Sequence, residues 1–159
     1  MTDSEQTFVH VDANPFIYAF EGEESLAVAL NGLFAFFGKH PGMALTSELT
    51  LAEVLPKARV PDLRRGYLEL MVSSGIFELK PITQSILLET ADYRRATMVT
   101  LPDGRQIMPK LPDAIHVVTA MRSGCRILLS TDSRLKVPAG MRVVEANEAG
   151  ITELVRELT

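Results

Sequence analysis

The sequence has one cysteine, no long apolar run and no excess of basic residues. Because Cys125 has no possible partner, an intrachain disulfide is excluded, as is usual in a reducing cytosol. No Cys/His spacing typical of a zinc site is present. The longest apolar stretches, 26–30 and 33–37, fall short of the roughly 18 residues that a membrane span needs. Residues 1–6 are acidic and polar, unlike a secretory signal. We therefore expect a cytoplasmic protein without a membrane association.

The charge balance also limits the function. The formal net charge is −4, whereas strong, non-specific nucleic-acid binders usually carry a basic excess. This argues less strongly against a metal-dependent nuclease, because its own acidic cluster subtracts charges that the ion then offsets. A chain of 159 residues with 47% hydrophobic and 23% charged residues is typical of a soluble globular protein. Since no repeat or linker interrupts it, we expect one domain spanning residues 1–159.

Strand-like and helix-like segments alternate along the chain. Strands are expected at 7–12, 43–46, 76–79, 126–130 and 141–144. Helices are expected at 16–20, 25–39, 47–58, 61–74, 83–97, 112–123 and 147–158, with 101–110 as a loop. Asn14 before Pro15 reads as the N-cap of the first helix. This alternation predicts an α/β fold, a three-layer α/β/α sandwich around a central, mostly parallel sheet. In such sheets ligands bind beyond the carboxyl ends of the strands.

Four acidic residues are candidates for a site at that edge. Asp12 and Asp132 follow predicted strands, and Asp113 opens a helix just after Pro112. Glu53 lies in an apolar helix, where an unpaired carboxylate is costly. No lysine or arginine near in sequence serves Asp12 or Glu53, and clustered acids raise one another's pKa unless a cation neutralises them. Oxygen-only ligands suit Mg²⁺ or Mn²⁺.

Each acid also has a simpler interpretation when taken alone. Asp113 is explained as an acid that interacts with the helix dipole. Asp12 and Asp132 fit turn positions, and Glu53 fits a solvent-facing helical position. These interpretations are individually adequate, but they do not explain why the four acids occur together in this order.

The ordered acids resemble the motifs of the PIN domain family. Residues 11–21 resemble the opening motif with Asp12, and residues 46–55 resemble the second motif with Glu53. The third and fourth motifs are matched by segments around Asp113 and Asp132, at 111–120 and 128–135. Each motif alone is a weak signal, but four in order at this spacing, over nearly the whole chain, are a strong one. The closest type is the VapC-like toxin of bacterial and archaeal toxin–antitoxin pairs.

The resemblance implies an endoribonuclease that uses Mg²⁺ or Mn²⁺ to hydrolyse RNA phosphodiesters. Asp12 and Asp113 would ligate the metal most directly, and Asp132 would complete or orient its shell. Glu53 would bind a second ion or position the attacking water. All four would thus be catalytic, although coupled carboxylates do not allow one general base to be assigned. The resemblance further implies an antitoxin partner and a plausible homodimer.

Two features depart from the family pattern. Such toxins often carry a further acid two residues after the fourth motif aspartate, where this chain has Arg134. The segment 100–110 is longer than the usual link into the third motif. The first departure removes a fifth carboxylate from the site. The second is expected to reshape the substrate entrance.

Other residues have weaker claims on function. His116, one helical turn beyond Asp113, is either a structural histidine or a contact to the substrate phosphate. Ser47 either caps the helix of Glu53 or contacts substrate, and the cap is favoured. Residues 33–37 are mainly core, with a part that could receive an antitoxin. Basic residues that could steer RNA, although solvated helix faces usually explain them, are Arg64, Arg65, Arg94 and Arg95.

Two other functions remain open. One is a catalytically weak PIN-like module that binds RNA or protein without a toxin role, which the negative charge and Arg134 favour. The other is a small phosphotransferase or phosphatase with Asp12 as its nucleophile. That chemistry usually needs a second acid or a glycine-rich phosphate loop, and residues 13–15 supply neither. It therefore ranks last.

Overall fold

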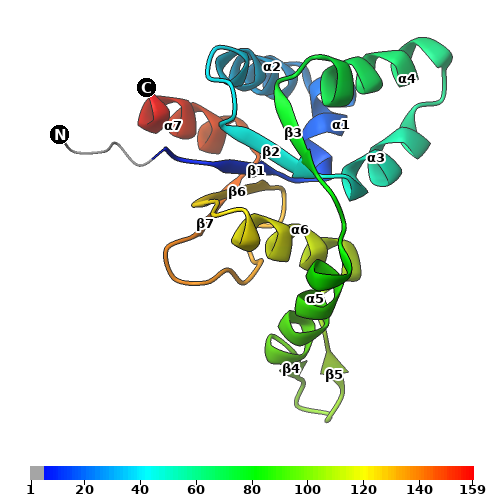
Figure 1. Cartoon of the computed structure of the whole chain (residues 1–159), viewed down its shortest axis with the longest axis vertical. Coiled ribbons are helices and arrows are strands. Elements are labelled where there is room, and N and C mark those ends of the chain that lie inside the picture. Colours follow the sequence, from blue (N-terminus) through cyan, green and yellow to red (C-terminus); the bar gives the residue numbers. More distant parts are fainter. Residues whose placement is uncertain (1–5) are drawn as a thin grey trace.

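The computed structural model describes residues 6–159 (Figure 1). Within that range, five parallel strands form one sheet in the order β3-β2-β1-β6-β7. The strands are β1 (Val9–Val11), β2 (Ala44–Ser47), β3 (Phe77–Lys80), β6 (Ile127–Ser130) and β7 (Arg142–Glu145). The helices are α1 (Ala13–Glu21), α2 (Glu24–Gly38), α3 (Leu49–Val54), α4 (Pro61–Leu68), α5 (Gln84–Ala96), α6 (Leu111–Arg122) and α7 (Glu148–Leu158). The expectation that residues 1–6 are no secretory signal falls mostly outside the described range.

Continuous apolar strands place the sheet in the centre of the fold. β1, β2 and β6 are buried along their whole length, as expected of parallel strands covered on both faces. β1 pairs with β2 on one side and with β6 on the other, so the first strand of the chain is the middle strand of the sheet. The predicted α/β fold with a central parallel sheet is confirmed.

The two faces of the sheet carry separate apolar clusters. Val9 and Val11 belong to the larger one, which also contains buried aromatic residues of α1 and α2. Leu45 and Leu128 belong to the smaller one, together with Val117 of α6. Figure 1 shows the corresponding layers, with α1 and α2 on one side of the sheet and α6 on the other. His10 alternates with the two valines along β1 and therefore faces α6.

Four local expectations are corrected by the structure. The N-cap of α1 is Asp12 and not Asn14, because the Asp12 carboxylate accepts a hydrogen bond from Ala13 N. The expected loop over 101–110 contains one strand of a hairpin, β5 (Gln106–Ile107), which pairs antiparallel with β4 (Val99–Thr100). The expected helix over 61–74 changes to a π-helical segment, η2 (Glu69–Ser73). A 3₁₀ turn, η1 (Leu55–Lys57), likewise ends the expected helix over 47–58.

Among the helices of residues 6–159, none combines the length and the apolar character that a membrane span requires.

Candidate active site

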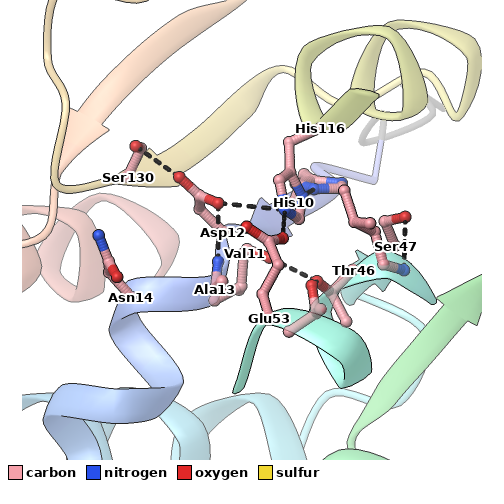
Figure 2. A network of polar contacts seen from close by, with 12 residues as sticks. His10, Val11, Asp12, Ala13, Asn14, Thr46, Ser47, Glu53, His116 and Ser130 are labelled. Carbon is pink, nitrogen blue, oxygen red and sulfur yellow. Dashed lines mark hydrogen bonds and ion pairs between the residues drawn. The ribbon is translucent and has the colours of Figure 1, made fainter. Parts of the chain in front are cut away.

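Asp12 lies at the carboxyl edge of the central strand, where β1 passes directly into α1. Its backbone N–H donates to Leu129 O at 3.0 Å, which extends the pairing with β6 by one residue. One carboxylate oxygen accepts from Ala13 N at 2.7 Å, and the other accepts from Ser130 Oγ at 2.8 Å (Figure 2). Asp12 is only 7% exposed, so these hydrogen bonds fix its carboxylate in a largely buried position.

His116 of α6 joins Asp12 to Glu53 of α3. Its Nε2 lies 2.6 Å from Glu53 Oε1 and 3.3 Å from Asp12 Oδ1. On the other side of the ring, His116 Nδ1 lies 2.9 Å from His10 Nε2, and both histidines are fully buried. Figure 2 shows the two carboxylates converging on the imidazole from different elements. Residues 10, 12, 53 and 116 thus form one polar network through the carboxyl edge of the sheet.

The start of α3 is fixed to β2 and β1 by short polar contacts. Thr46 Oγ1 donates to Val11 O at 2.6 Å and also lies 2.7 Å from Thr50 Oγ1. Ser47 Oγ accepts from Leu49 N at 3.1 Å, but the N-cap of α3 is Glu48, so the capping role predicted for Ser47 is corrected: Ser47 ends β2, one residue before the cap. These contacts position α3, whose next turn carries Glu53. The Glu53 side chain remains 26% exposed.

Asp113 and Asp132 lie at the rim of the same edge. Asp113 is in the first turn of α6, one turn before His116. Burial raises the pKa of Asp113, and the neighbouring charges of Asp12 and Asp132 raise it further. By contrast, hydrogen bonds from Arg134 to Asp132 lower the pKa of that aspartate. Both rim aspartates line a cavity of about 400 Å³.

The two histidines differ in their preferred charge. Burial and the nearby His116 hold the pKa of His10 well below its usual range, so His10 stays neutral. Burial also lowers the pKa of His116, but the hydrogen bond to Glu53 and the charge of Asp12 outweigh it and raise the pKa overall. An imidazolium between two carboxylates is therefore favoured at this position.

The structure brings Asp12 and Glu53 together through His116, and it places Asp113 close enough to interact electrostatically with Asp12. The all-oxygen ligand set stays a prediction, and the structure adds an imidazole nitrogen that lies among the carboxylates. His116 satisfies the structural interpretation, since both ring nitrogens have partners, but it also contacts the site itself. In the sequence, the only indication that His116 belongs to the site was its position one helical turn beyond Asp113.

The donor set fits a divalent cation. Asp12, Glu53 and His116 each offer one ligand atom, and these three atoms lie within 4.8 Å of one another. Neither carboxylate forms an ion pair with a lysine or arginine of residues 6–159. Carboxylates suit Mg²⁺ and Mn²⁺, and imidazole adds affinity for transition metals. The two carboxylates thus form a candidate metal site, and a proton on His116 balances part of their charge while no ion is bound. His116 would itself be a ligand only after losing that proton.

Other candidate residues have local structural roles. Arg94 Nε donates to Pro109 O at 2.9 Å and so holds the hairpin end, and Arg65 pairs with Asp62 on the surface of α4. In the segment 33–37, three residues are fully buried or nearly so, whereas Phe36 is half-buried and stacks on a neighbouring histidine ring. Among the described residues, these features indicate structural roles for most of the segment and for both arginines.

Comparison with known proteins identifies the family. The sequence model of the PIN domain matches residues 9–141, which include all four acids and His116. The chain belongs to the PIN domain family. The family prediction is thereby confirmed. No curated protein matches the sequence at a significant level.

Solved structures of similar fold include toxins. A toxin–antitoxin complex from Klebsiella pneumoniae aligns with a TM-score of 0.60 at 23% identity, over 88% of this chain and 98% of that one. VapC20 of Mycobacterium tuberculosis, a toxin that cleaves the sarcin–ricin loop, aligns with a TM-score of 0.55 at 14% identity, over 76% of this chain and 86% of that one. PAE2754 of Pyrobaculum aerophilum aligns with a TM-score of 0.55 at 21% identity, over 94% of this chain and 98% of that one. At these identities the likeness shows a shared PIN fold.

Proposed function

We propose that this PIN domain protein is a divalent-metal-dependent endoribonuclease, the toxin of a toxin–antitoxin pair. The observation that carries the proposal is the pair of carboxylates, Asp12 and Glu53, that meet at the carboxyl edge of a parallel sheet without a lysine or arginine partner in residues 6–159. Similar folds in a toxin–antitoxin complex and in VapC20 support the assignment. The metal would be Mg²⁺ or Mn²⁺.

The four acids would share the metal site unequally. Asp12 is fixed by two hydrogen bonds and would be a direct ligand, and Asp113 would be the second because its charge is poorly compensated. Glu53 would exchange its contact with His116 for the metal or its bound water. Asp132 would act at the rim, since Arg134 already compensates its charge. A bound ion would supply an activated water and polarise the scissile phosphate.

His116 would hold the acids ready for the ion. Its Nε2 lies against Asp12 and Glu53, so both carboxylates remain oriented toward one point when no ion is bound. His10 in turn fixes the imidazole ring through Nδ1. In this proposal His116 is a positioning residue, and an incoming cation would take over its role of balancing the two negative charges.

An RNA cleavage assay tests the activity. The protein is incubated with single-stranded and structured RNAs in Mg²⁺, Mn²⁺ or EDTA, beside Asp12→Asn and a control, Asp62→Asn, whose carboxylate lies on the surface of α4. We expect cleavage with either metal by the unmodified protein and by the control. EDTA and Asp12→Asn should each abolish it. Equal cleavage by Asp12→Asn, or none with any RNA, would overturn the proposal.

The toxin role needs a separate test. Expression of the chain should arrest bacterial growth, and co-expression of a short protein encoded beside it should restore growth and form a complex. A homodimer, a cytoplasmic location and a single domain over residues 1–159 are part of the same proposal. Growth unaffected by the active nuclease would indicate a housekeeping enzyme instead.

The second candidate is a PIN-like binding module with little turnover. It is favoured by the Arg134–Asp132 pair and by His116, which already engage three of the four acids of the site. This candidate predicts RNA or protein binding that is equally strong in EDTA and in Mn²⁺. Metal-dependent cleavage that Asp12→Asn abolishes would exclude it.

A further inference from the structure

The hairpin formed by β4 and β5 exposes apolar side chains beside the acidic site. In Figure 1 it projects beyond the end of α5, away from the central sheet. Val99 and Ile107 are opposite each other in the register, so their side chains lie on the same face of the hairpin. They are 45% and 52% exposed, and the following Met108 is 46% exposed. Exposed apolar side chains that are grouped, unlike ones scattered singly, are a feature of interaction sites.

Two consecutive residues of α5 hold this surface in place. Arg94 Nε donates to Pro109 O at 2.9 Å and anchors the strand that leaves the hairpin. Tyr93 OH donates to Lys136 O at 2.6 Å and anchors the loop between β6 and β7. A two-stranded hairpin is only marginally stable by itself, so these anchors matter. The hairpin and the loop are therefore both fixed to α5 before any ligand arrives.

A cavity of about 400 Å³ lies between the hairpin and the loop. Its apolar walls come from Val99, Ile107 and Met108 on the hairpin and from Leu135 on the loop. The same cavity reaches Asp113 and Asp132, which belong to the proposed metal site. Its volume is within the range of about 300 to 1,000 Å³ that is usual for small-ligand sites. A group bound here would thus adjoin the reacting phosphate.

The charges around the cavity favour a polyanion. Lys110, Arg134 and Lys136 all line it, although the chain as a whole has a net charge of −4. Lys110 interacts electrostatically with both rim aspartates, and Arg134, whose side chain is 90% exposed, pairs with one of them. Three cations around an apolar cavity match a strand of nucleic acid, which combines charged phosphates with flat, weakly polar bases. An acidic rim alone would repel such a strand.

We propose that this cavity receives an unpaired RNA base next to the scissile phosphate. The base would lie against Val99, Ile107 and Met108, while Lys110 and Lys136 would contact the flanking phosphates. Since a paired base cannot leave its stack without cost, the cavity would select single-stranded positions and set the base preference at the cleavage site. The inference rests on the proposed nuclease function. An apolar peptide in the same cavity is the competing occupant.

Base binding is measured with the full chain and short single-stranded RNAs that carry 2-aminopurine at successive positions. The experiment uses Mn²⁺ and the Asp12→Asn background, which prevents cleavage. We expect the fluorescence to change at one position only. Ile107→Ser should weaken binding of that RNA roughly tenfold and remove the change. Val28→Ser changes an even more exposed apolar residue of α2 outside the cavity, and it should leave both the RNA binding and the fluorescence change unaltered.

Three results would overturn the inference. The first is equal binding by Ile107→Ser and Val28→Ser. The second is a fluorescence change that Ile107→Ser leaves intact. The third is loss of a peptide partner by Ile107→Ser with RNA binding unaltered, which would assign the cavity to a protein.

A parallel cleavage assay separates this inference from the function on which it rests. With the Asp12 side chain intact, Ile107→Ser should still cleave RNA but with altered base preference at the cut, and its Mn²⁺ binding should be unchanged. Cleavage with an unaltered preference would overturn the base pocket and leave the nuclease proposal standing. No cleavage by the unmodified protein would overturn the nuclease proposal, and the inference with it.

Discussion

Replacing His116 by leucine should destabilise the metal-free protein strongly. Leucine has a similar volume, so the change removes the hydrogen bonds with little new cavity. It leaves the carboxylates of Asp12 and Glu53 facing each other, and it leaves His10 Nε2 without its partner. Breaking a buried charged pair by removing one member costs about 3–5 kcal/mol. Because the Glu53 side chain is 26% exposed, we expect the lower end, about 3 kcal/mol.

Urea denaturation at pH 7 in EDTA measures this loss. Thr119→Val is the matched control on the same helix, because Thr119 Oγ1 is buried without a hydrogen-bond partner in residues 6–159. Its removal should change the free energy of unfolding by less than about 1 kcal/mol. Glu53→Gln removes the charge that His116 balances. The double variant His116→Leu/Glu53→Gln should therefore lose less stability than the two single losses added together, by at least about 1 kcal/mol.

Saturating Mn²⁺ should restore part of the stability of His116→Leu, because the ion would balance the same two carboxylates. The reasoning is refuted if His116→Leu costs no more than Thr119→Val. It is also refuted if the losses of the two single variants add, since additivity would mean that His116 and Glu53 do not interact in solution.

Further predictions concern pH, the last helix and the rim. The folded-state pKa of His116 lies above 6.5, so its stabilisation is complete below that pH and is lost as the pH rises through the folded value. The pKa of His10 is lowered, so its contribution to stability is present above pH 6.5 and is lost as the pH falls through the folded value. When unfolding is measured across pH, His116→Leu should remove the decline in stability at high pH, and His10→Asn should remove the decline at low pH. Gly150→Ala would press a Cβ against the main-chain oxygen at the end of β7, and thermal denaturation should show a loss of about 1–3 kcal/mol. Arg134→Ala removes an exposed ion pair, so stability should change by less than about 1 kcal/mol while NMR titration finds a higher pKa for Asp132.

The sequence was a good guide to the sheet and its helices. Buried parallel strands carry long apolar runs, and residues 127–130 were recognisable because every side chain there is covered. The carboxyl-edge rule then located Asp12 and Asp132, which both follow strands that lie next to each other in the sheet. Those positions depend on local pattern and chain order, which a sequence contains.

The partner of the two carboxylates was not predictable in the same way. His10 and His116 are 106 residues apart, and their contact depends on how α6 crosses the sheet. A histidine in a buried strand and another on a helix each have ordinary structural explanations, so neither indicates the other. The N-cap was misassigned for a related reason, because Asn14 turns to Thr131 of a distant loop and leaves Asp12 to begin α1.

The hairpin was missed because its strands contain little sequence signal. β4 and β5 are two residues each, and all four residues are exposed, so no apolar alternation marks them. Only the unusual length of the segment 100–110 suggested an altered substrate entrance. The anchor from Arg94 to Pro109 O lies between positions 15 residues apart and has no local pattern.

Calorimetric titration with Mn²⁺ tests the central claim most directly. The unmodified protein, Asp113→Asn and the surface control Asp62→Asn are compared at the same pH and salt concentration. A metal site built from the acids predicts a saturable isotherm for the unmodified protein and the control, and its loss in Asp113→Asn. An isotherm that Asp113→Asn leaves intact, or no Mn²⁺ uptake by the unmodified protein, would contradict the claim.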